Sequence, residues 1–411
     1  MVTYIANIVV SYRKSSMNVF SENIISASKK IKPIIKWTGG KFNEFNQFSD
    51  YLPGFEKYFE PFFGGGGVFF ALQPAGEAYL NDKSEDLIKF YRLTNSDLFK
   101  KELFTYCDAW DEAGILCEKL QPELFLLDKA CMAEEISPAT FNEKTRELVW
   151  GLLTSDSHLL FDASFIVDPK KFFNTLTKSI ADKSRRIKNI AVKKGRLFTD
   201  EEMADHIETG IKSGLYLFLR QLTNLQFKGS LKMTDEKATA NWYFVREFCY
   251  ASMFRYNRTG GFNIPYGGIA YNRKNFRQKV ESIFSPEVKS LFANSTFYNL
   301  DFAAFLKETP PGENDFIFLD PPYDSEFSEY DQNSFTKQDQ VRLRDVLFET
   351  RAKWMLVIKE TEFIRSLYTS DKCSFIEFDK TYTYNVRGRN NRETRHLIII
   401  NYQTEPGFIG L

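Results

Sequence analysis

The feature that most constrains the fold is a short apolar run that ends at an acid and two prolines. Residues 316–319 are all apolar, and Asp320, Pro321, Pro322 and Tyr323 follow directly in the sequence DFIFLDPPY. Each proline fixes φ at about −65° and has no N–H to donate, so a strand cannot continue through this pair. The run therefore predicts a short buried strand that stops at Asp320.

The acid at the end of this strand suggests a ligand site. In an open α/β sheet, ligands bind in the crevice at the carboxyl ends of the strands. The proline pair offers carbonyl oxygens but no donors, and together with the Asp320 carboxylate it forms a group of acceptors. Such a group can hold an amino group and orient its nitrogen lone pair toward an electrophile. Tyr323 would then stack on the flat ring that carries the amino group. A simple proline cap on the strand explains the prolines, but not the acid and the tyrosine together.

A glycine-rich turn occurs much earlier in the chain. The sequence YFEPFFGGGGVFFAL (58–72) predicts a strand, a tight turn and the start of a helix. This is not a phosphate-binding P-loop, because no GK[ST] follows, and Lys41 in WTGGKF precedes Phe42. Asp82 ends the next short strand, AYLND. An acid there can accept hydrogen bonds from ribose hydroxyls, and an ordinary loop aspartate fits the spacing equally well.

The pattern along the chain predicts one α/β domain with a large insertion. Strand signals occur early and return after residue 295 in STFYNLDF, KWMLVI, SFIEF and HLIIINY, and a long helical stretch lies between. We therefore expect three parts: an N-terminal extension (1–30), an α/β core domain (31–95 and 290–411), and a mainly helical inserted region (96–289).

Composition excludes little. Lys plus Arg equals Asp plus Glu at 54 each, so the net charge does not indicate a partner. The five cysteines and three histidines show no zinc-binding spacing, so no metal site is expected. No stretch approaches the roughly 20 apolar residues of a membrane span, and the N-terminus lacks a secretory pattern. We expect a cytoplasmic protein.

Two segments inside the insertion suggest contact with nucleic acid. Residues 178–196 contain eight Lys or Arg and one Asp, which fits a phosphate-facing surface or a solvated helix face. Arg185 and Arg186 lie at the centre of this segment. The sequence RYNRTGGFNIPYGG (255–268) alternates glycine, aromatic and basic residues, as in a hairpin that turns near Gly260-Gly261.

Four motifs together resemble one enzyme family. The order KWTGGK (36–41), FEPFFGGGG (59–67), RYNRTGGFNIPYG (255–267) and DPPY (320–323) is similar to that of Dam-type, D12-class (alpha group) DNA adenine-N6 methyltransferases. The resemblance implies S-adenosylmethionine as the methyl donor and a Rossmann-like methyltransferase sheet with a C-terminal antiparallel strand. It also implies that the inserted region recognises the DNA target.

The resemblance assigns roles to individual residues. It implies a catalytic pocket formed by Asp320, Pro321, Pro322 and Tyr323. It places these residues around the cofactor: Trp37, Gly39, Lys41, Glu60, Pro61, Phe62, Gly64, Gly66, Asp82 (at the ribose), Asp301 and Phe302 (beside the adenine). In the hairpin it implies that Arg255 reads a guanine edge and that Asn257 and Arg258 contact phosphates.

The implied reaction is transfer of a methyl group from a sulfonium directly to N6 of an adenine that is flipped out of duplex DNA. It needs neither a metal nor a covalent enzyme intermediate. The setting would be a restriction–modification system with a cognate restriction endonuclease, a phage, or an orphan gene. Family members that read GATC commonly carry Phe/Tyr-Asn-Gly before the hairpin arginine. This chain has Tyr250-Ala251-Ser252-Met253 instead, which argues against GATC.

Two other functions remain open from the sequence. Related PPY motifs serve methylation of RNA bases or of protein glutamine, usually with Asn at the position of Asp320. A methyltransferase-like fold that only binds DNA is the third reading, and the intact DPPY argues against it.

Overall fold

The computed structural model describes residues 31–155, 159–195, 198–253, 256–257, 260–322, 335–368, 372–381 and 393–404. These residues form two compact units, one of residues 31–92 with 285–404 and the other of residues 93–284. The observed division falls at 92/93 and 284/285, where the sequence suggested 95/96 and 289/290. The N-terminal extension (1–30) lies outside the described residues.

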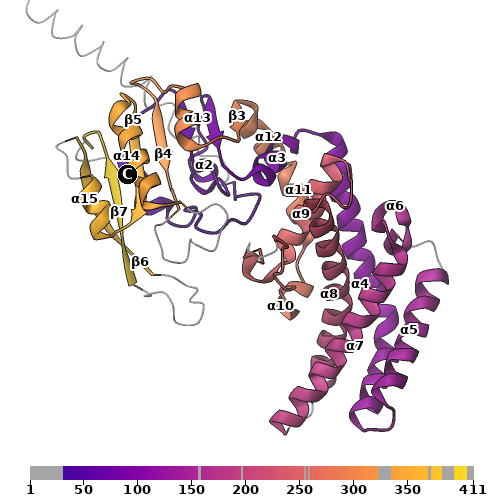
Figure 1. Ribbon diagram of the computed structural model, residues 1–411. Coiled ribbons are helices and arrows are strands. Elements are labelled where there is room, and N and C mark those ends of the chain that lie inside the picture. Colours follow the sequence, from indigo (N-terminus) through magenta and orange to yellow (C-terminus); the bar gives the residue numbers. More distant parts are fainter. Residues whose placement is uncertain are drawn as a thin grey trace, which may run out of the picture. The chain divides into compact units, whose positions relative to one another are not determined.

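The first unit is built on a mixed sheet (Figure 1). In the described residues its seven strands lie in the order β3-β2-β1-β4-β5-β7-β6. Their bounds are Tyr58–Glu60 (β1), Ala78–Asn81 (β2), Ser295–Tyr298 (β3), Phe316–Leu319 (β4), Lys353–Lys359 (β5), Ser374–Thr381 (β6) and Glu393–Ile400 (β7). Strands β1 to β5 are parallel, and β7 is antiparallel to both β5 and β6. The fold class, the later strands and the antiparallel last strand are as predicted.

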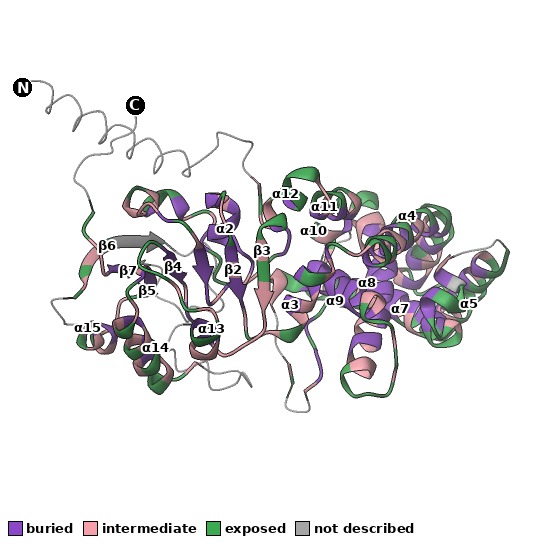
Figure 2. Ribbon diagram, turned by 90° about the horizontal axis from the view of Figure 1, so that it is seen from above, coloured by how far each residue is buried: buried purple, intermediate pink, exposed green. Residues whose placement is uncertain are grey.

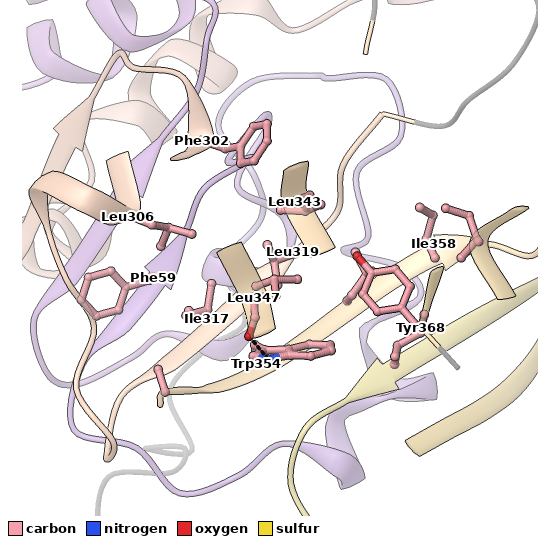
Figure 3. Packing of buried hydrophobic residues seen from close by; sticks show 14 of the residues in the cluster. Phe59, Phe302, Leu306, Ile317, Leu319, Leu343, Leu347, Trp354, Ile358 and Tyr368 are labelled. Atoms are coloured by element: carbon pink, nitrogen blue, oxygen red, sulfur yellow. Dashed lines mark hydrogen bonds between the residues drawn. The ribbon is translucent and has the colours of Figure 1, made fainter. Parts of the chain in front are cut away.

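One face of the sheet packs against three helices: α13 (Phe302–Glu308), α14 (Lys337–Glu349) and α15 (Glu362–Leu367). Side chains alternate along β4, so Ile317 and Leu319 point into this layer. Trp354 of β5 is fully buried there, and its indole N–H donates to the Leu347 carbonyl of α14 at 3.0 Å (Figure 3). Burying a side chain of this size stabilises the layer by about 2–3 kcal/mol.

The opposite face is covered by further short helices: η1 (Phe45–Gln47), η2 (Ser49–Tyr51), α2 (Gly67–Leu72), α3 (Glu85–Leu93) and α12 (Pro286–Ala293). Phe318 of β4 points to this opposite face and stacks on Phe48 with ring centroids 5.6 Å apart. Phe69 of α2 stacks on Phe292 of α12 at 6.0 Å. Figure 2 shows the central strands buried between these two layers, so the unit is a three-layer α/β sandwich.

The second unit is helical in its described residues. Its elements are α4 (Asp97–Met132), α5 (Pro138–Ser155), η3 (Leu159–Phe161), α6 (Ala163–Ile166), α7 (Pro169–Lys194), α8 (Asp200–Phe227), α9 (Asp235–Phe248), η4 (Tyr250–Ser252), α10 (Ile269–Asn272) and α11 (Phe276–Ile283). A capping box between Thr199 and Glu202 fixes the start of α8. A Cβ on Gly214 would lie 2.9 Å from Cα of Leu176, so glycine lets α7 and α8 lie in close contact.

Candidate active site

The strand order reverses between β1 and β4. The chain runs from β1 outward to β2 and β3, and β4 then returns to the other side of β1. Because β1 and β4 are parallel neighbours, Glu60 at the end of β1 and Asp320 just after β4 emerge at the same edge. In doubly wound α/β sheets the ligand crevice lies at such a reversal. The predicted catalytic acid therefore sits where the fold itself predicts a ligand.

Lys41 forms an ion pair with Asp320. The lysine Nζ lies 2.5 Å from Oδ1 of Asp320, and it also donates to the carbonyl of Gly39 at 3.2 Å. The side chains of Lys41 and Asp320 are 1% and 17% exposed. Removing one partner from a buried pair costs about 3–5 kcal/mol, because the other charge loses its counter-ion. Lys41, predicted at the cofactor, thus holds the carboxylate of the predicted catalytic acid.

The glycine-rich turn packs directly on the segment that carries Lys41. A Cβ on Gly64 would lie 2.9 Å from Cδ1 of Trp37, and one on Gly67 would lie 2.9 Å from the backbone nitrogens of Lys41 and Phe42. Gly64 also has a φ of +51°, a left-handed conformation that glycine adopts readily. The family resemblance placed Gly64 and Gly66 of this turn around the cofactor. The structure gives the turn a further role, because Gly64 and Gly67 allow two chain segments to meet and so fix Lys41.

Asp82 is bonded to the same turn. Its Oδ2 accepts a hydrogen bond from the backbone N–H of Gly64 at 2.9 Å, and its Oδ1 accepts one from Ser84 at 2.8 Å. The side-chain amide of Asn299 donates to the Asp82 carbonyl at 2.9 Å. The carboxylate predicted to hold a ribose therefore lies directly after β2, beside the glycine-rich turn, and is oriented by main-chain donors.

Asn81 was missed by the sequence analysis. It is 1% exposed, and its amide donates to the carbonyls of Pro61 at 3.0 Å and Leu300 at 3.1 Å. Its Oδ1 accepts the Leu300 N–H at 2.9 Å. Asn81 ends β2, and its side chain thereby ties β2 to the segment that follows β1 and to the segment that follows β3. A polar residue closing a buried strand was the available signal.

Asp301 and Phe302 begin α13. Asp301 caps that helix by accepting the Ala303 N–H at 3.1 Å, and the same Oδ1 accepts from Nη2 of Arg342 at 2.8 Å. Phe302 is 4% exposed and packs on Phe62 with ring centroids 5.5 Å apart. The structure thus brings together two of the predicted aromatic residues and adds Arg342, to which the sequence analysis had assigned no role.

Glu60 is a buried acid. It is 2% exposed and accepts a hydrogen bond from the Tyr58 hydroxyl at 2.8 Å. Burial raises the pKa of the Glu60 carboxyl well above its usual range, and the nearby Asp320 and Asp82 carboxylates raise it further, although the Tyr58 hydrogen bond opposes them. Glu60 therefore keeps its proton to higher pH than an exposed glutamate.

Gln340 of α14 contacts the proline pair. It is fully buried, and its Nε2 donates to the Pro322 carbonyl at 3.2 Å. Within the described part of the chain its Oε1 has no hydrogen-bond partner. The structure thus adds a residue that orients the turn after Asp320. Tyr323 lies outside the described residues, so its stacking role stays a prediction.

The comparison with protein families identifies the family of the chain. The model of the D12 class N6 adenine-specific DNA methyltransferases matches residues 37–118 and 172–384, which include both the Lys41 and the Asp320 segments. The chain belongs to this family. This confirms the resemblance and the enzyme class predicted from the sequence.

Curated relatives of this D12-class methyltransferase agree. Type II methyltransferase M.CviBI of Paramecium bursaria Chlorella virus NC1A is 26% identical over 377 residues, 90% of this chain and 100% of that protein. The DNA adenine methylase of Vibrio cholerae is 22% identical over 88% of this chain and 94% of its own length. The retron Ec67 DNA adenine methylase of Escherichia coli is 33% identical, but over only 35% of this chain and 48% of that protein.

The hairpin of the methyltransferase closes where predicted. Asn257 donates its backbone N–H to the Gly261 carbonyl at 2.8 Å, and its side-chain Oδ1 accepts the Gly261 N–H at 2.8 Å. Gly260 has a φ of +75° within this turn. Asn257, predicted to contact phosphate, therefore also shapes the turn. Arg255 and Arg258 lie outside the described residues.

The basic segment of α7 is helical, as predicted, but part of its charge is neutralised. Arg185 pairs with Asp182 at 3.1 Å, and Lys178 pairs with the same carboxylate. Arg186 is exposed on this helix. The segment therefore presents less positive charge than its composition suggests.

Two further findings concern the described residues alone. They contain no group of three or more His, Cys, Asp or Glu side chains that could hold a metal ion. None of their helices is long and apolar enough to cross a membrane.

Proposed function

We propose that this methyltransferase modifies N6 of adenine at one DNA sequence, with S-adenosylmethionine as the donor and Asp320 as the acceptor that orients the adenine amino group. The observation that carries this proposal is the position of Asp320. It follows β4 at the reversal of strand order, and Lys41 holds its carboxylate there at 2.5 Å.

The residues around this edge suit S-adenosylmethionine. The oriented Asp82 carboxylate can accept hydrogen bonds from ribose hydroxyls. Phe62 and Phe302 offer an aromatic surface for the adenine, next to Asp301. A Cβ on Gly39 would meet no atom of the described residues within 4 Å, which leaves room beside this glycine of the WTGGK segment. When bound, the cofactor supplies an electrophilic methyl group on a positively charged sulfur.

The acceptors for the adenine amino group would be the Asp320 carboxylate and the carbonyl of Pro321. The Pro322 carbonyl already accepts a hydrogen bond from Gln340, which leaves the Pro321 carbonyl to accept one from the adenine amino group. Two bonds from the amino group would turn the nitrogen lone pair out of the ring plane and toward the methyl carbon. As the N6–carbon bond forms, the bond between the methyl carbon and the sulfonium sulfur would break and leave a neutral thioether, and the amino nitrogen would lose one proton, which the Asp320 carboxylate can accept. Tyr323 would stack on the adenine ring.

The helical unit would recognise the DNA. Adenine N6 is inaccessible inside a duplex, so the target base must flip out. In this proposal Arg255 reads a guanine edge, Asn257 and Arg258 contact phosphates, and Arg185 and Arg186 add positive charge. The Tyr250–Met253 sequence favours a site other than GATC.

The biological setting is part of the proposal. Three curated relatives are named type II methyltransferases, which supports a restriction–modification system with a cognate endonuclease. Membership in the D12 family favours DNA adenine over RNA bases or protein glutamine as the substrate. The enzyme would act in the cytoplasm, with DNA.

The test is long-read modification sequencing of DNA from a methylation-deficient host that expresses the chain. We expect N6-methyladenine in one sequence context, and its loss in Asp320→Ala. The matched control is Asp345→Ala, which removes an exposed carboxylate on α14 and should leave methylation intact. Unmodified adenine in cells containing folded, cofactor-binding protein would overturn the proposal.

A further inference from the structure

One face of α8 holds the chain that returns from the hairpin. Phe262 forms an antiparallel bridge with Tyr256 and so belongs to the hairpin stem. Both main-chain polar groups of Phe262 are bonded to one side chain of α8: Asn224 donates to its carbonyl at 3.0 Å and accepts its N–H at 2.7 Å. Asn224 thus replaces the hydrogen bonds that a neighbouring strand would provide.

The next contact along the returning chain is at Ile264. Its carbonyl accepts two hydrogen bonds at 2.8 Å, one from the Tyr216 hydroxyl and one from Nη1 of Arg220. Tyr216 is fully buried, and Ile264 is 3% exposed. Two donors on one carbonyl leave this residue little freedom to shift.

The spacing explains why a helix can hold an extended chain in this way. Tyr216, Arg220 and Asn224 are four residues apart, so they lie on one face of α8 and each step rises about 6 Å. Two residues of extended chain span about 6.6 Å. The step from Arg220 to Asn224 on the helix therefore matches the step from Ile264 to Phe262 on the returning chain, and Tyr216 adds a second donor to Ile264.

A second anchor fixes the far end of the same segment. The Asn272 carbonyl accepts from Nζ of Lys212 at 2.6 Å, and its side-chain amide donates to the Thr209 hydroxyl at 3.0 Å. Tyr266 donates to the Asn272 side chain at 3.0 Å. Asn272 is 3% exposed and Lys212 6%. The chain from residue 262 to residue 272 is thus bonded to α8 at both ends.

We propose that this face of α8 sets the position of the hairpin for sequence recognition, and that Asn224 is a positioning residue for that step. The inference rests on the proposed DNA-reading role of the hairpin. Base-edge hydrogen bonds discriminate only when their donors are held to within about 0.5 Å. A hairpin released from α8 would reach near-cognate sites almost as well as the correct one.

The experiment compares kcat/KM on duplexes carrying the cognate site and on duplexes with one base pair changed, using the full chain. Asn224→Leu removes both bonds to Phe262 at similar volume. We expect the ratio of cognate to near-cognate kcat/KM to fall about tenfold. KM for cognate DNA should rise, while KM for S-adenosylmethionine should stay unchanged.

Two further variants separate positioning from folding. Tyr216→Phe keeps the buried ring and removes one of the two donors to Ile264, so the ratio should fall by a smaller factor of about two to three. Asn241→Leu is the matched control. This buried α9 residue donates to Leu219 and Thr223 of α8, and no hydrogen bond joins it to the described residues of the hairpin. It should lower the unfolding temperature without changing the ratio.

The outcomes are distinct. Wild-type protein that methylates no DNA overturns the proposed function itself. A sequence-specific wild type with unchanged ratios in Asn224→Leu and Tyr216→Phe overturns the positioning role. An equal loss of specificity in Asn241→Leu also overturns it, since general destabilisation would then explain the effect. Selective loss in the two α8 variants supports the proposal.

Discussion

The buried pair of Lys41 and Asp320 gives the sharpest prediction. Lys41→Met keeps the length and apolar stem of the side chain and removes the ammonium. The lysine is 1% exposed and its Nζ lies 2.5 Å from Asp320, so the carboxylate loses its nearest positive charge. Removal of one partner from a fully buried pair costs about 3–5 kcal/mol. The 17% exposure of Asp320 lets water recover part of this, and we expect a loss of about 2–3 kcal/mol.

A double-mutant cycle isolates the interaction. Asp320→Asn leaves the buried ammonium without its carboxylate, so this variant should also be destabilised. The double variant should lose clearly less stability than the sum of the single changes, with a coupling energy of about 2 kcal/mol. Thermal unfolding should show each single change as a decrease of about 5–10 °C in the transition of the sheet unit.

Activity provides a second measurement of the same variant. Lys41→Met retains the acceptor oxygens of Asp320 but no longer holds them, so kcat should fall about 10- to 100-fold. KM for DNA should change little, because the proposal assigns DNA recognition to the helical unit. A lower kcat with an unchanged KM for DNA would show that Lys41 positions the Asp320 carboxylate rather than the DNA substrate.

The control is Lys57→Met in the same unit. Lys57 pairs with Glu77 at 3.1 Å, but the two side chains are 44% and 60% exposed, so solvent can replace the interaction. Its unfolding temperature should remain close to that of the wild type. If Lys41→Met proves equally harmless, or if the two single effects simply add in the double variant, the pair does not hold the site as argued.

Three more predictions concern the helical unit. Burial raises the pKa of Asp128 to about 6, so the free energy of unfolding should fall as pH rises from about 4 to about 6. In urea unfolding, Asp128→Asn should remove this dependence on pH, and a dependence that persists in the variant would contradict the prediction. Ala251 has a φ of +53°, a left-handed conformation that strains any residue with a Cβ, so Ala251→Gly should raise the free energy of unfolding by about 0.5–1 kcal/mol. A lowered unfolding temperature in this variant would exclude backbone strain at Ala251. Reversing the charges of Arg185 and Arg186 should weaken binding to all DNA sequences alike and flatten its salt dependence in anisotropy titrations; unchanged affinity would leave α7 a solvated helix.

The local parts of the fold could be predicted from the sequence. The apolar run 316–319 is a strand with the expected bounds, because prolines end it whatever surrounds it. The runs around residues 295–298 and 353–359 are also strands, as the sequence predicted. The start of α13 was not predicted. The pattern STFYNLDF predicted a single strand, but Asp301 caps a helix there by accepting the Ala303 N–H.

The contacts that complete the site were beyond the sequence. Lys41 and Asp320 are 279 residues apart, and nothing local to either indicates the pairing. Asn81, Gln340 and Arg342 act through bonds to main chain or side chains on other elements. For Asn81 and Gln340 the available signal was a polar side chain in an otherwise buried position, whereas Arg342 is exposed and gave no such signal. Which partner it finds depends on how strands and helices pack.

Three acids meet at one edge of the sheet, and their different surroundings are informative. Like charges at adjacent strand ends repel, so three ionised carboxylates would destabilise the fold. Asp82 is stabilised by main-chain N–H donors, and Asp320 by the Lys41 ammonium. In the described residues Glu60 accepts instead from the Tyr58 hydroxyl, and burial raises the pKa of its carboxyl well above the usual range. Asp82 and Asp320 are therefore the two acids at this edge whose carboxylates are oriented by main-chain or ammonium donors. In the proposed reaction each has its own partner, since Asp82 binds the cofactor sugar and Asp320 binds the amino group that receives the methyl.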